Sequence, residues 1–143
     1  MDLTEIVKRF EGFHRVVRWQ PVPTAAPYLC PAGYWTRGFG VLCKKDAGEI
    51  TLPEAEAELA VLLPAYVAHA QRLSPRLTGD RLVAISDFIF NLGPTRYAAS
   101  TLRRRVNDED WPEARREIRK WVFGGGRKLP GLIIRREAEA ALL

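Results

Sequence analysis

The chain has few of the residues that build disulfide scaffolds or metal sites. Its 143 residues include only two cysteines, Cys30 and Cys43, and two histidines, His14 and His69. Two cysteines are too few for the dense cross-links of a small secreted scaffold. Together with the two histidines they also leave too few soft ligands for a structural zinc site. We therefore expect no metal.

Long apolar runs are also missing. No window approaches the ~18 apolar residues of a membrane-spanning helix. The N-terminus carries Asp2 and Glu5 and has no continuous apolar stretch, so the sequence supports no signal peptide. We expect a protein that is made and kept soluble in a cytoplasm. The 47% hydrophobic content fits one globular domain with a real core.

Positive charge is present in excess, and it is unevenly distributed. The formal net charge is +5, but residues 96–136 alone hold twelve Lys or Arg against five Asp or Glu, a net charge of +7. A basic face attracts nucleic acid, anionic membranes and anionic cell-wall polymers through the same long-range field. Charge therefore does not choose between these partners.

Helical periodicity covers most of the chain. Leu3, Ile6, Val7 and Phe10 form one stripe, which predicts an opening helix that ends close to Glu11. Further helices are predicted after a capping box at Thr51 and Glu54, over 79–92, after a second capping box at Asp110 and Glu113, and over about 132–142. We expect Pro64 to kink or interrupt the second helix, Gly93 to end the third in a left-handed turn, and Ile118, Trp121 and Val122 to form the buried side of the fourth.

A small β element is expected between the first two helices. Residues 19–27 contain three prolines, which remove backbone donors and predict a loop. The glycines, aromatics and Thr36 between Tyr28 and Leu42 suit a short antiparallel hairpin. The run 124–128, Gly-Gly-Gly-Arg-Lys, lacks the spacing of a phosphate-binding loop, so nucleotide binding is not expected.

Two short motifs carry a family resemblance. The first is Phe10-Glu11-Gly12-Phe13, and the second is the run from Cys30 to Gly40, Cys-Pro-Ala-Gly-Tyr-Trp-Thr-Arg-Gly-Phe-Gly. Together they resemble the phage-type lysozymes, the endolysin muramidases grouped as glycoside hydrolase family twenty-four. The runs 88–93, 100–102 and 126–132, with Arg135, Arg136 and Glu137, resemble the helical lobe of the same family.

The resemblance covers nearly the whole chain and implies a fold. It implies one α+β, lysozyme-like catalytic domain over residues 1–143, mostly helical with one small antiparallel β-hairpin lobe. The hairpin lobe would occupy about 12–50 and the helical lobe about 51–143. We expect Arg135, Arg136 and Glu137 to serve packing or salt bridges.

The resemblance also assigns roles in catalysis. Hydrolysis of a glycosidic bond needs a proton for the leaving oxygen and a nucleophile or activated water at the anomeric carbon. Glu11 would be the acid, Cys30 the nucleophile or water-activating group, and Thr36 its positioning partner. Because an exposed Glu is ionised at neutral pH, the role requires apolar neighbours. The aromatic residues that could supply them are Phe10, Phe13, Tyr34 and Trp35.

The sequence around these residues departs from the usual family pattern. Family members usually carry Asp where Cys30 falls, and some carry Cys. The interval between Glu11 and Cys30 is longer than usual, and Val41-Leu42 stands where many members have His. Cys43 is either a free thiol or a disulfide partner that would mask Cys30. We expect substrate contacts from Tyr34, Trp35, Arg127 and Lys128.

The expected function is that of an endolysin that causes host cell lysis. It would hydrolyse the β-1,4 bond between N-acetylmuramic acid and N-acetylglucosamine in bacterial peptidoglycan, as a monomer without cofactor or nucleic acid. It would reside in the host cytoplasm before release and act on the cell wall in the periplasm. It would depend on a holin-type membrane protein to reach that wall.

Three alternatives remain open at this point. A lytic transglycosylase would cleave the same bond without adding water. A Cys-dependent cell-wall peptidase or amidase would use Cys30 as nucleophile and His69 or His14 as base. A non-catalytic polyanion-binding module would use only the basic C-terminal face.

Overall fold

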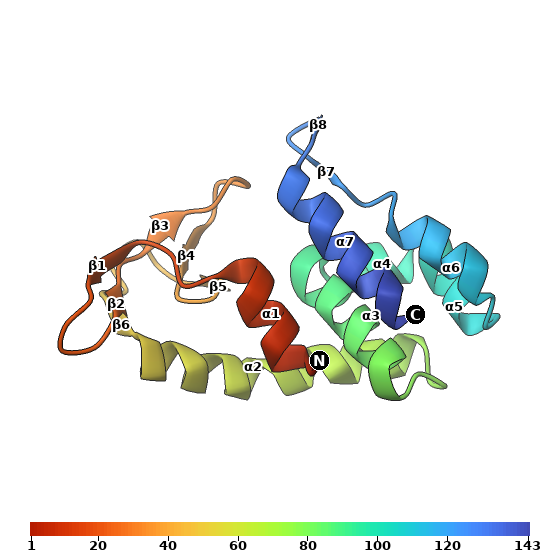
Figure 1. Cartoon of the computed structure of the whole chain (residues 1–143), viewed down its shortest axis with the longest axis horizontal. Coiled ribbons are helices and arrows are strands. Elements are labelled where there is room, and N and C mark those ends of the chain that lie inside the picture. Colours follow the sequence, from red (N-terminus) through yellow and green to blue (C-terminus); the bar gives the residue numbers. More distant parts are fainter. The chain divides into compact units, whose positions relative to one another are not determined.

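The computed structural model describes all 143 residues, and helices account for more than half of them (Figure 1). The contacts divide the chain into two compact units. The helical unit comprises residues 1–6 and 63–143, and the hairpin unit comprises residues 7–62. The boundaries between the units fall inside helices α1 (Leu3–Glu11) and α2 (Leu52–Leu73), whereas the predicted lobes meet near residue 50. The prediction of one catalytic domain stays a prediction.

Helix α1 begins with reciprocal caps and ends at the predicted acid. The backbone N–H of Glu5 donates to Asp2 Oδ1, and the N–H of Asp2 donates to Glu5 Oε2, each over 2.8 Å. These bonds satisfy N–H groups that a helix start leaves without partners. Leu3, Ile6 and Val7 are buried, as their spacing predicts.

Three small antiparallel sheets replace the single β element that we predicted. One contains β1 (Val16–Arg18), β2 (Thr24–Ala25) and β6 (Ile50–Thr51) in the order β1-β2-β6. The second is the predicted hairpin extended by a strand, in the order β3 (Tyr28–Leu29), β4 (Trp35–Arg37), β5 (Val41–Leu42). The third pairs β7 (Phe123–Gly124) with β8 (Arg127–Lys128).

The prediction of a loop over 19–27 was therefore wrong at its end, where β2 pairs with both β1 and β6. Strands of two or three residues are too short to show an alternating pattern in the sequence. Their pairing depends on partners from distant parts of the chain.

Helix α2 starts at the predicted capping box. The N–H of Thr51 donates to Glu54 Oε2 over 2.9 Å, and the N–H of Glu54 donates to Thr51 Oγ1 over 3.3 Å. The whole helix has 22 residues and continues without a break past Pro64, so the expected interruption does not occur. Buried Leu59 and Ala70 keep an apolar stripe in the interior on either side of the proline.

Helix α3 (Gly79–Leu92) matches its prediction and supplies much of the helical core. Gly93 ends it with φ 90° and ψ 155°, which is not the predicted left-handed turn. The chain instead enters α4 (Pro94–Ala98) at once, followed by α5 (Thr101–Asn107), and neither helix was predicted. Both are short, so their periodicity is weak. The Ser100 hydroxyl caps α5 by accepting from the N–H of Arg103 over 3.0 Å.

The last two helices complete the unit. In α6 (Trp111–Ile118) the Asp110 carboxylate accepts from the N–H of Glu113 over 3.3 Å, which is one half of the predicted capping box. Trp121 and Val122 lie beyond the end of this helix, so their predicted place on it was wrong. They still belong to the interior: Val122 is buried, and the Trp121 ring meets the Phe88 ring edge-on at 5.5 Å. Helix α7 (Pro130–Leu142) closes the chain.

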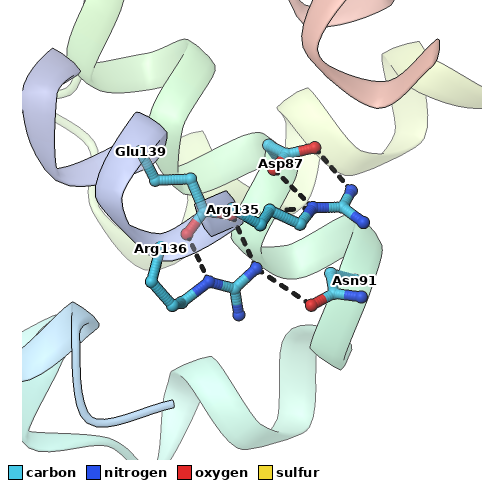
Figure 2. Close-up of polar contacts among 5 residues, drawn as sticks. All are labelled: Asp87, Asn91, Arg135, Arg136 and Glu139. Atoms are coloured by element: carbon cyan, nitrogen blue, oxygen red, sulfur yellow. Dashed lines mark hydrogen bonds and ion pairs between the residues drawn. The ribbon is translucent and has the colours of Figure 1, made fainter. Parts of the chain in front are cut away.

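A buried ionic cluster joins α3 to α7 (Figure 2). Arg135 donates two hydrogen bonds to Asp87, from Nη2 to Oδ1 over 2.7 Å and from Nε to Oδ2 over 2.9 Å. Arg136 donates through Nη2 to Glu139 Oε1 over 2.8 Å and to Asn91 Oδ1 over 2.9 Å. The predicted structural roles of Arg135 and Arg136 are confirmed, and Glu137 forms a surface pair with Arg119 over 2.8 Å.

The pKa values of the two acids in this cluster are shifted in opposite directions. Burial raises the pKa of Glu139 well above its usual value, because the Arg136 charge only partly offsets the loss of water. Burial also acts to raise the pKa of Asp87, but the hydrogen bonds and charge of Arg135 outweigh it, and the pKa of Asp87 is lowered. Because removing one partner of a buried pair leaves an uncompensated charge, a single substitution in the cluster should destabilise the packing of α7 on α3.

Candidate active site

Glu11 is half-buried at the last position of α1, in close contact with the turn between β4 and β5. A Cβ added to Gly40 would lie 2.5 Å from Glu11 Oε2 and 3.1 Å from Glu11 Cδ. Gly40 also has φ +77°, a backbone conformation that side chains disfavour. Only glycine at this position therefore lets the hairpin approach the carboxylate.

Aromatic rings lie close to the same turn, in part as predicted. The Phe13 ring, which follows α1, packs against Phe39 with centroids 5.7 Å apart. Lys8 Nζ lies 5.5 Å from the Phe39 centroid and also pairs with Glu56. The turn that contacts Glu11 thus follows a packed pair of aromatic rings with a cation nearby.

Thr36 lies at the centre of β4 and is almost fully buried, with 4% of its surface exposed. It is the cross-strand partner of Tyr28, and its hydroxyl donates to the Tyr28 backbone carbonyl over 3.4 Å. The hydroxyl therefore points along the β3–β4 seam instead of into solvent.

Cys30 closes the turn between β3 and β4. Its N–H donates to the Tyr34 carbonyl over 2.9 Å, and its carbonyl accepts from the N–H of Gly33 over 2.9 Å. Gly33, at φ +87°, makes this tight turn possible. The thiol is half-buried and free.

The two cysteines lie on opposite faces of this sheet. Cys43 pairs with Trp35 through an N–H to carbonyl bond of 3.0 Å, so its side chain lies on the Trp35 face. Cys30 follows Tyr28 by two residues and therefore shares the face of Tyr28 and Thr36. Both cysteines are free, so the alternative of a Cys30–Cys43 disulfide was wrong.

The pKa of Tyr28, the cross-strand partner of Thr36, depends on all three predicted catalytic residues. Burial raises the pKa of Tyr28, and the negative charges of Glu11 and Cys30 raise it further. A side-chain hydrogen bond with Thr36 and the positive charge of Arg15 act in the opposite direction. The Tyr28 phenol therefore lies within the electrostatic influence of the acid, the thiol and the hydroxyl.

The predicted substrate contacts divide between several places. Tyr34 is exposed at the tip of the β3–β4 hairpin. Trp35 is half-buried on the face opposite Thr36, with Lys45 Nζ 5.6 Å from its ring centroid. Arg127 and Lys128 are exposed on β8 in the helical unit, and Lys128 Nζ lies 6.0 Å from the Phe123 centroid.

The proline-rich stretch forms the connection between β1 and β2. Trp19 is 69% exposed in this connection, and the Gln20–Pro21 peptide is cis. At its start, Arg18 pairs with Glu49, the residue before β6, over 2.6 Å. The Val41-Leu42 pair forms β5, with Leu42 exposed. The longer interval thus includes the β1–β2 connection, and Val41-Leu42 pairs with β4 as a strand.

Three neighbours of the site were missed at the level of sequence: Tyr28, Gly40 and Arg15. Gly40 ends the motif that carries the resemblance and Tyr28 lies two residues before its start, but the motif does not say that Gly40 contacts Glu11. Arg15 has φ +60° although it is not glycine, and such strain often occurs at functional sites. No pattern in the sequence reveals that conformation.

Neither His, Cys, Asp nor Glu side chains form a group of three or more that could hold a metal ion. Among the helices, not one is both long and apolar enough to cross a bilayer.

The helical architecture with small sheets defines a lysozyme-like glycosidase. Residues 8–139 match the family model described as Phage lysozyme, and the chain therefore belongs to the phage lysozyme family. It is a peptidoglycan-degrading endolysin.

Individual relatives agree with this assignment. An endolysin of Acyrthosiphon pisum secondary endosymbiont phage 1 is 35% identical, over 96% of this chain and 91% of the relative. A SAR-endolysin of Bacteriophage PS119 is 31% identical, over 79% of this chain and 70% of the relative. The solved muramidase domain of SpmX from Asticaccaulis excentricus is 28% identical with a TM-score of 0.80, over 98% of this chain and 92% of that domain.

Proposed function

We propose that the chain hydrolyses the β-1,4 bond between N-acetylmuramic acid and N-acetylglucosamine, with Glu11, Cys30 and Thr36 as the reacting and positioning groups. The observation that carries the proposal is geometric: Cys30 and Thr36 share one face of the β3–β4 sheet, and Glu11 lies against the turn that follows β4. An acid and a second reactive group on opposite sides of the scissile bond are what glycoside hydrolysis requires.

Glu11 acts as the general acid. It gives its proton to the departing glycosidic oxygen as the sugar develops oxocarbenium character. The contact with Gly40 supports this role, because a carboxyl group confined at one edge keeps a defined orientation toward the substrate.

Cys30 supplies the second function by one of two routes. As a thiolate it attacks the anomeric carbon, and water later displaces the sulfur; alternatively it accepts a proton from a water that attacks directly. The Thr36 hydroxyl, whose proton goes to the Tyr28 carbonyl, holds the water or the sugar by accepting a hydrogen bond from it. Its near-complete burial beside Tyr28 favours a fixed orientation.

Exposed side chains are proposed to bind the polymer. Tyr34, at the tip of the β3–β4 hairpin, offers a ring face for a sugar, and Arg127 and Lys128 offer charges to the acidic groups of peptidoglycan. Trp35 contributes less than Tyr34, because its ring lies on the face opposite Thr36. Loss of affinity in Tyr34→Ala, greater than in Trp35→Ala, tests this order.

A digestion series on purified cell walls tests the catalytic roles. We expect Glu11→Gln and Cys30→Ser to abolish release of soluble muropeptides, while the matched controls Glu49→Gln and Cys43→Ser retain it. If Cys30→Asp retains activity, water activation is favoured over covalent attack. An active Glu11→Gln variant would remove the assigned acid.

Mass spectrometry of the same digests separates hydrolysis from transglycosylation. Hydrolysis adds one water to each cleaved bond, whereas a lytic transglycosylase leaves an anhydro sugar of lower mass. Membership of a glycosidase family answers the other two alternatives, the Cys-dependent peptidase with His14 or His69 and the non-catalytic polyanion-binding module.

The enzyme acts on the cell wall. We further propose that it is a monomer held in the host cytoplasm until a holin-type membrane protein releases it to the periplasm, and that nucleic acid is not a partner. Lysis of cells that express the chain alone, without added membrane permeabilisation, would argue against holin dependence. The basic surface should make wall digestion weaker as ionic strength rises.

A further inference from the structure

A pocket of about 250 Å³ lies within the helical unit, between the α2–α3 connection and the turn that joins α5 to α6 (Figure 1). Its floor is apolar, since Leu77 and Val106 line it and each is only 3% exposed. The volume lies below the roughly 300–1,000 Å³ of pockets that bury drug-sized ligands. The pocket therefore suits one small group, such as a single sugar residue, and not a longer chain.

Trp111 gives the pocket an aromatic wall and is held in place by its neighbours. It is the first residue of α6 and directly follows Asp110, whose carboxylate caps that helix. The Arg81 guanidinium lies 3.9 Å from the Trp111 ring centroid, and Arg81 Nε donates to the Leu143 carbonyl over 3.0 Å. A ring held in this way offers apolar surface to a ligand at little cost in conformational entropy.

A charged pair supplies the polar groups of the pocket. Arg76 Nη1 lies 3.2 Å from Glu109 Oε2, and Arg76 Nη2 donates to the Asn107 backbone carbonyl. The two charged side chains remain 67% and 49% exposed. A guanidinium has several N–H donors and a carboxylate has several acceptor sites, so the pair can also bind hydroxyl groups without separating.

Glu109 has a backbone conformation that its residue type disfavours, with φ +57°. Its N–H donates to the Val106 carbonyl over 3.0 Å, and the N–H of Asp110 donates to the Arg105 carbonyl over 2.9 Å. These bonds form the Schellman ending of a helix, in which glycine is usual at the position that Glu109 occupies. The exposed pair with Arg76 stabilises the fold less than the left-handed conformation costs a residue with a Cβ. Stability of the fold therefore does not explain a glutamate at this position, and such strain often accompanies function.

N-Acetylglucosamine has the chemistry that these groups recognise. Its ring has an apolar face of C–H groups that can pack on an aromatic side chain, and its hydroxyls both donate and accept hydrogen bonds. It carries no charge that would compete with the pair between Arg76 and Glu109. Its acetamido methyl suits an apolar floor such as that of Leu77 and Val106.

We propose that this pocket binds one N-acetylglucosamine residue of the glycan, with Trp111 against the sugar ring and with Arg76 and Glu109 on its hydroxyls. It is a second binding site, because no residue proposed for catalysis lines it. It holds the enzyme on its polymer between cleavages. The choice of sugar rests on the proposed function, but the site does not depend on the catalytic role of Glu11.

Nuclear magnetic resonance of the isotope-labelled full chain tests the site directly. With N-acetylglucosamine as the probe, we expect saturable shifts of the Trp111 indole N–H and of the backbone amides of residues 107–111. Glucose has a hydroxyl in place of the acetamido group and should bind roughly 10-fold more weakly, because the apolar floor loses its methyl group. Shifts confined to residues of the hairpin unit, or equal affinities for the two sugars, overturn the proposal. A short peptide probe that shifts these signals when the sugar does not also overturns it.

Glu109→Gly separates binding from stability. Glycine adopts positive φ without strain, so this variant should keep or raise the Tm of wild type. Its affinity for N-acetylglucosamine at the Trp111 signal should fall roughly 10- to 100-fold, the effect of losing hydrogen bonds to a charged group. Glu137→Gln is the matched control, since it alters an exposed Arg–Glu pair outside the pocket and should bind as wild type. Equal affinities of Glu109→Gly and wild type contradict the proposal.

Two further measurements keep the outcomes distinct. If Glu109→Gly fails to fold by circular dichroism, Glu109→Asn takes its place, because asparagine tolerates positive φ and also removes the carboxylate. Cell-wall digestion by Glu11→Gln tests the proposed function separately. An active Glu11→Gln overturns the assigned acid and leaves the Trp111 shifts unchanged, whereas an inactive Glu11→Gln with no Trp111 shifts overturns only the second site.

Discussion

The two units of the molecule are held together in different ways. In the helical unit, side-chain packing joins the elements: a contiguous apolar cluster from α2 to α7 surrounds Phe88 and Tyr97. Four charged residues are also buried, Asp87, Arg135, Arg136 and Glu139. In the hairpin unit, backbone geometry dominates. Strands of two or three residues are joined by tight turns, with positive φ at Gly33, Gly38 and Gly40.

The comparison shows how stability and chemistry are distributed. The ionic cluster of the helical unit is inaccessible to a substrate, because its four charged side chains are nearly or fully buried. The residues proposed for catalysis lie in the hairpin unit, where Glu11 and Cys30 remain partly open to solvent. Functional groups are often carried by turns that a more rigid scaffold supports. Variants in the helical unit should therefore lose mainly stability, and variants around the proposed site in the hairpin unit should lose mainly activity.

The largest expected effect on stability is in the buried cluster. Asp87→Asn leaves the Arg135 charge with a neutral partner in the interior, which should lower the free energy of unfolding by about 3–5 kcal/mol. Thermal and urea unfolding measure the loss. Asp80→Asn, an exposed change in the first turn of the same helix, should cost only about 0.3–1 kcal/mol. Equal losses in the two variants would mean that the cluster does not hold the helical unit together.

Gly40→Ala should separate activity from stability in the hairpin unit. The strained positive φ costs about 1–2 kcal/mol, and the new Cβ displaces the Glu11 carboxylate, so activity should fall on the order of 100-fold. Gly48→Ala is the control, because Gly48 has φ +82° and nothing within 4 Å of the added Cβ. It should lose similar stability and keep its activity. If Gly40→Ala is as active as Gly48→Ala, the contact with Glu11 is unimportant.

The smallest expected effect concerns the pH dependence of stability. Because the pKa of Glu139 is raised in the folded state, its contribution is fully present below the unfolded value of about 4.5 and is lost as pH rises through the folded value. Glu139→Gln should remove this decline, so its Tm should fall less than that of wild type from pH 4.5 upward.

Two features make that measurement specific to Glu139. Asp87 does not obscure it, since its lowered pKa acts only below its usual range. Glu137→Gln, in the exposed pair with Arg119, should leave the slope of wild type unchanged. Parallel curves for wild type and Glu139→Gln would show that Glu139 has the same pKa folded and unfolded.

The elements predicted well are those with strong local signals. Leu3, Ile6 and Val7 repeat at helical spacing, and Thr51 with Glu54 marks a helix start, so α1 and the beginning of α2 could be predicted. The short α4 and α5, and the two-residue β2, lack such signals. The interior position of Asp87 and Glu139 could not be predicted either, because a charged residue in a helical pattern normally faces solvent.

The amino-acid sequence by itself determined the family and the main helices and supplied the proposed acid, thiol and hydroxyl, because these depend on short-range spacing and on residue type. Only the tertiary structure decided that Tyr28 pairs with Thr36, that Gly40 lies against Glu11 and that Cys43 faces away from Cys30. The physical reason is that strand register and the approach of a turn to a helix end are set by long-range contacts, which no local pattern encodes.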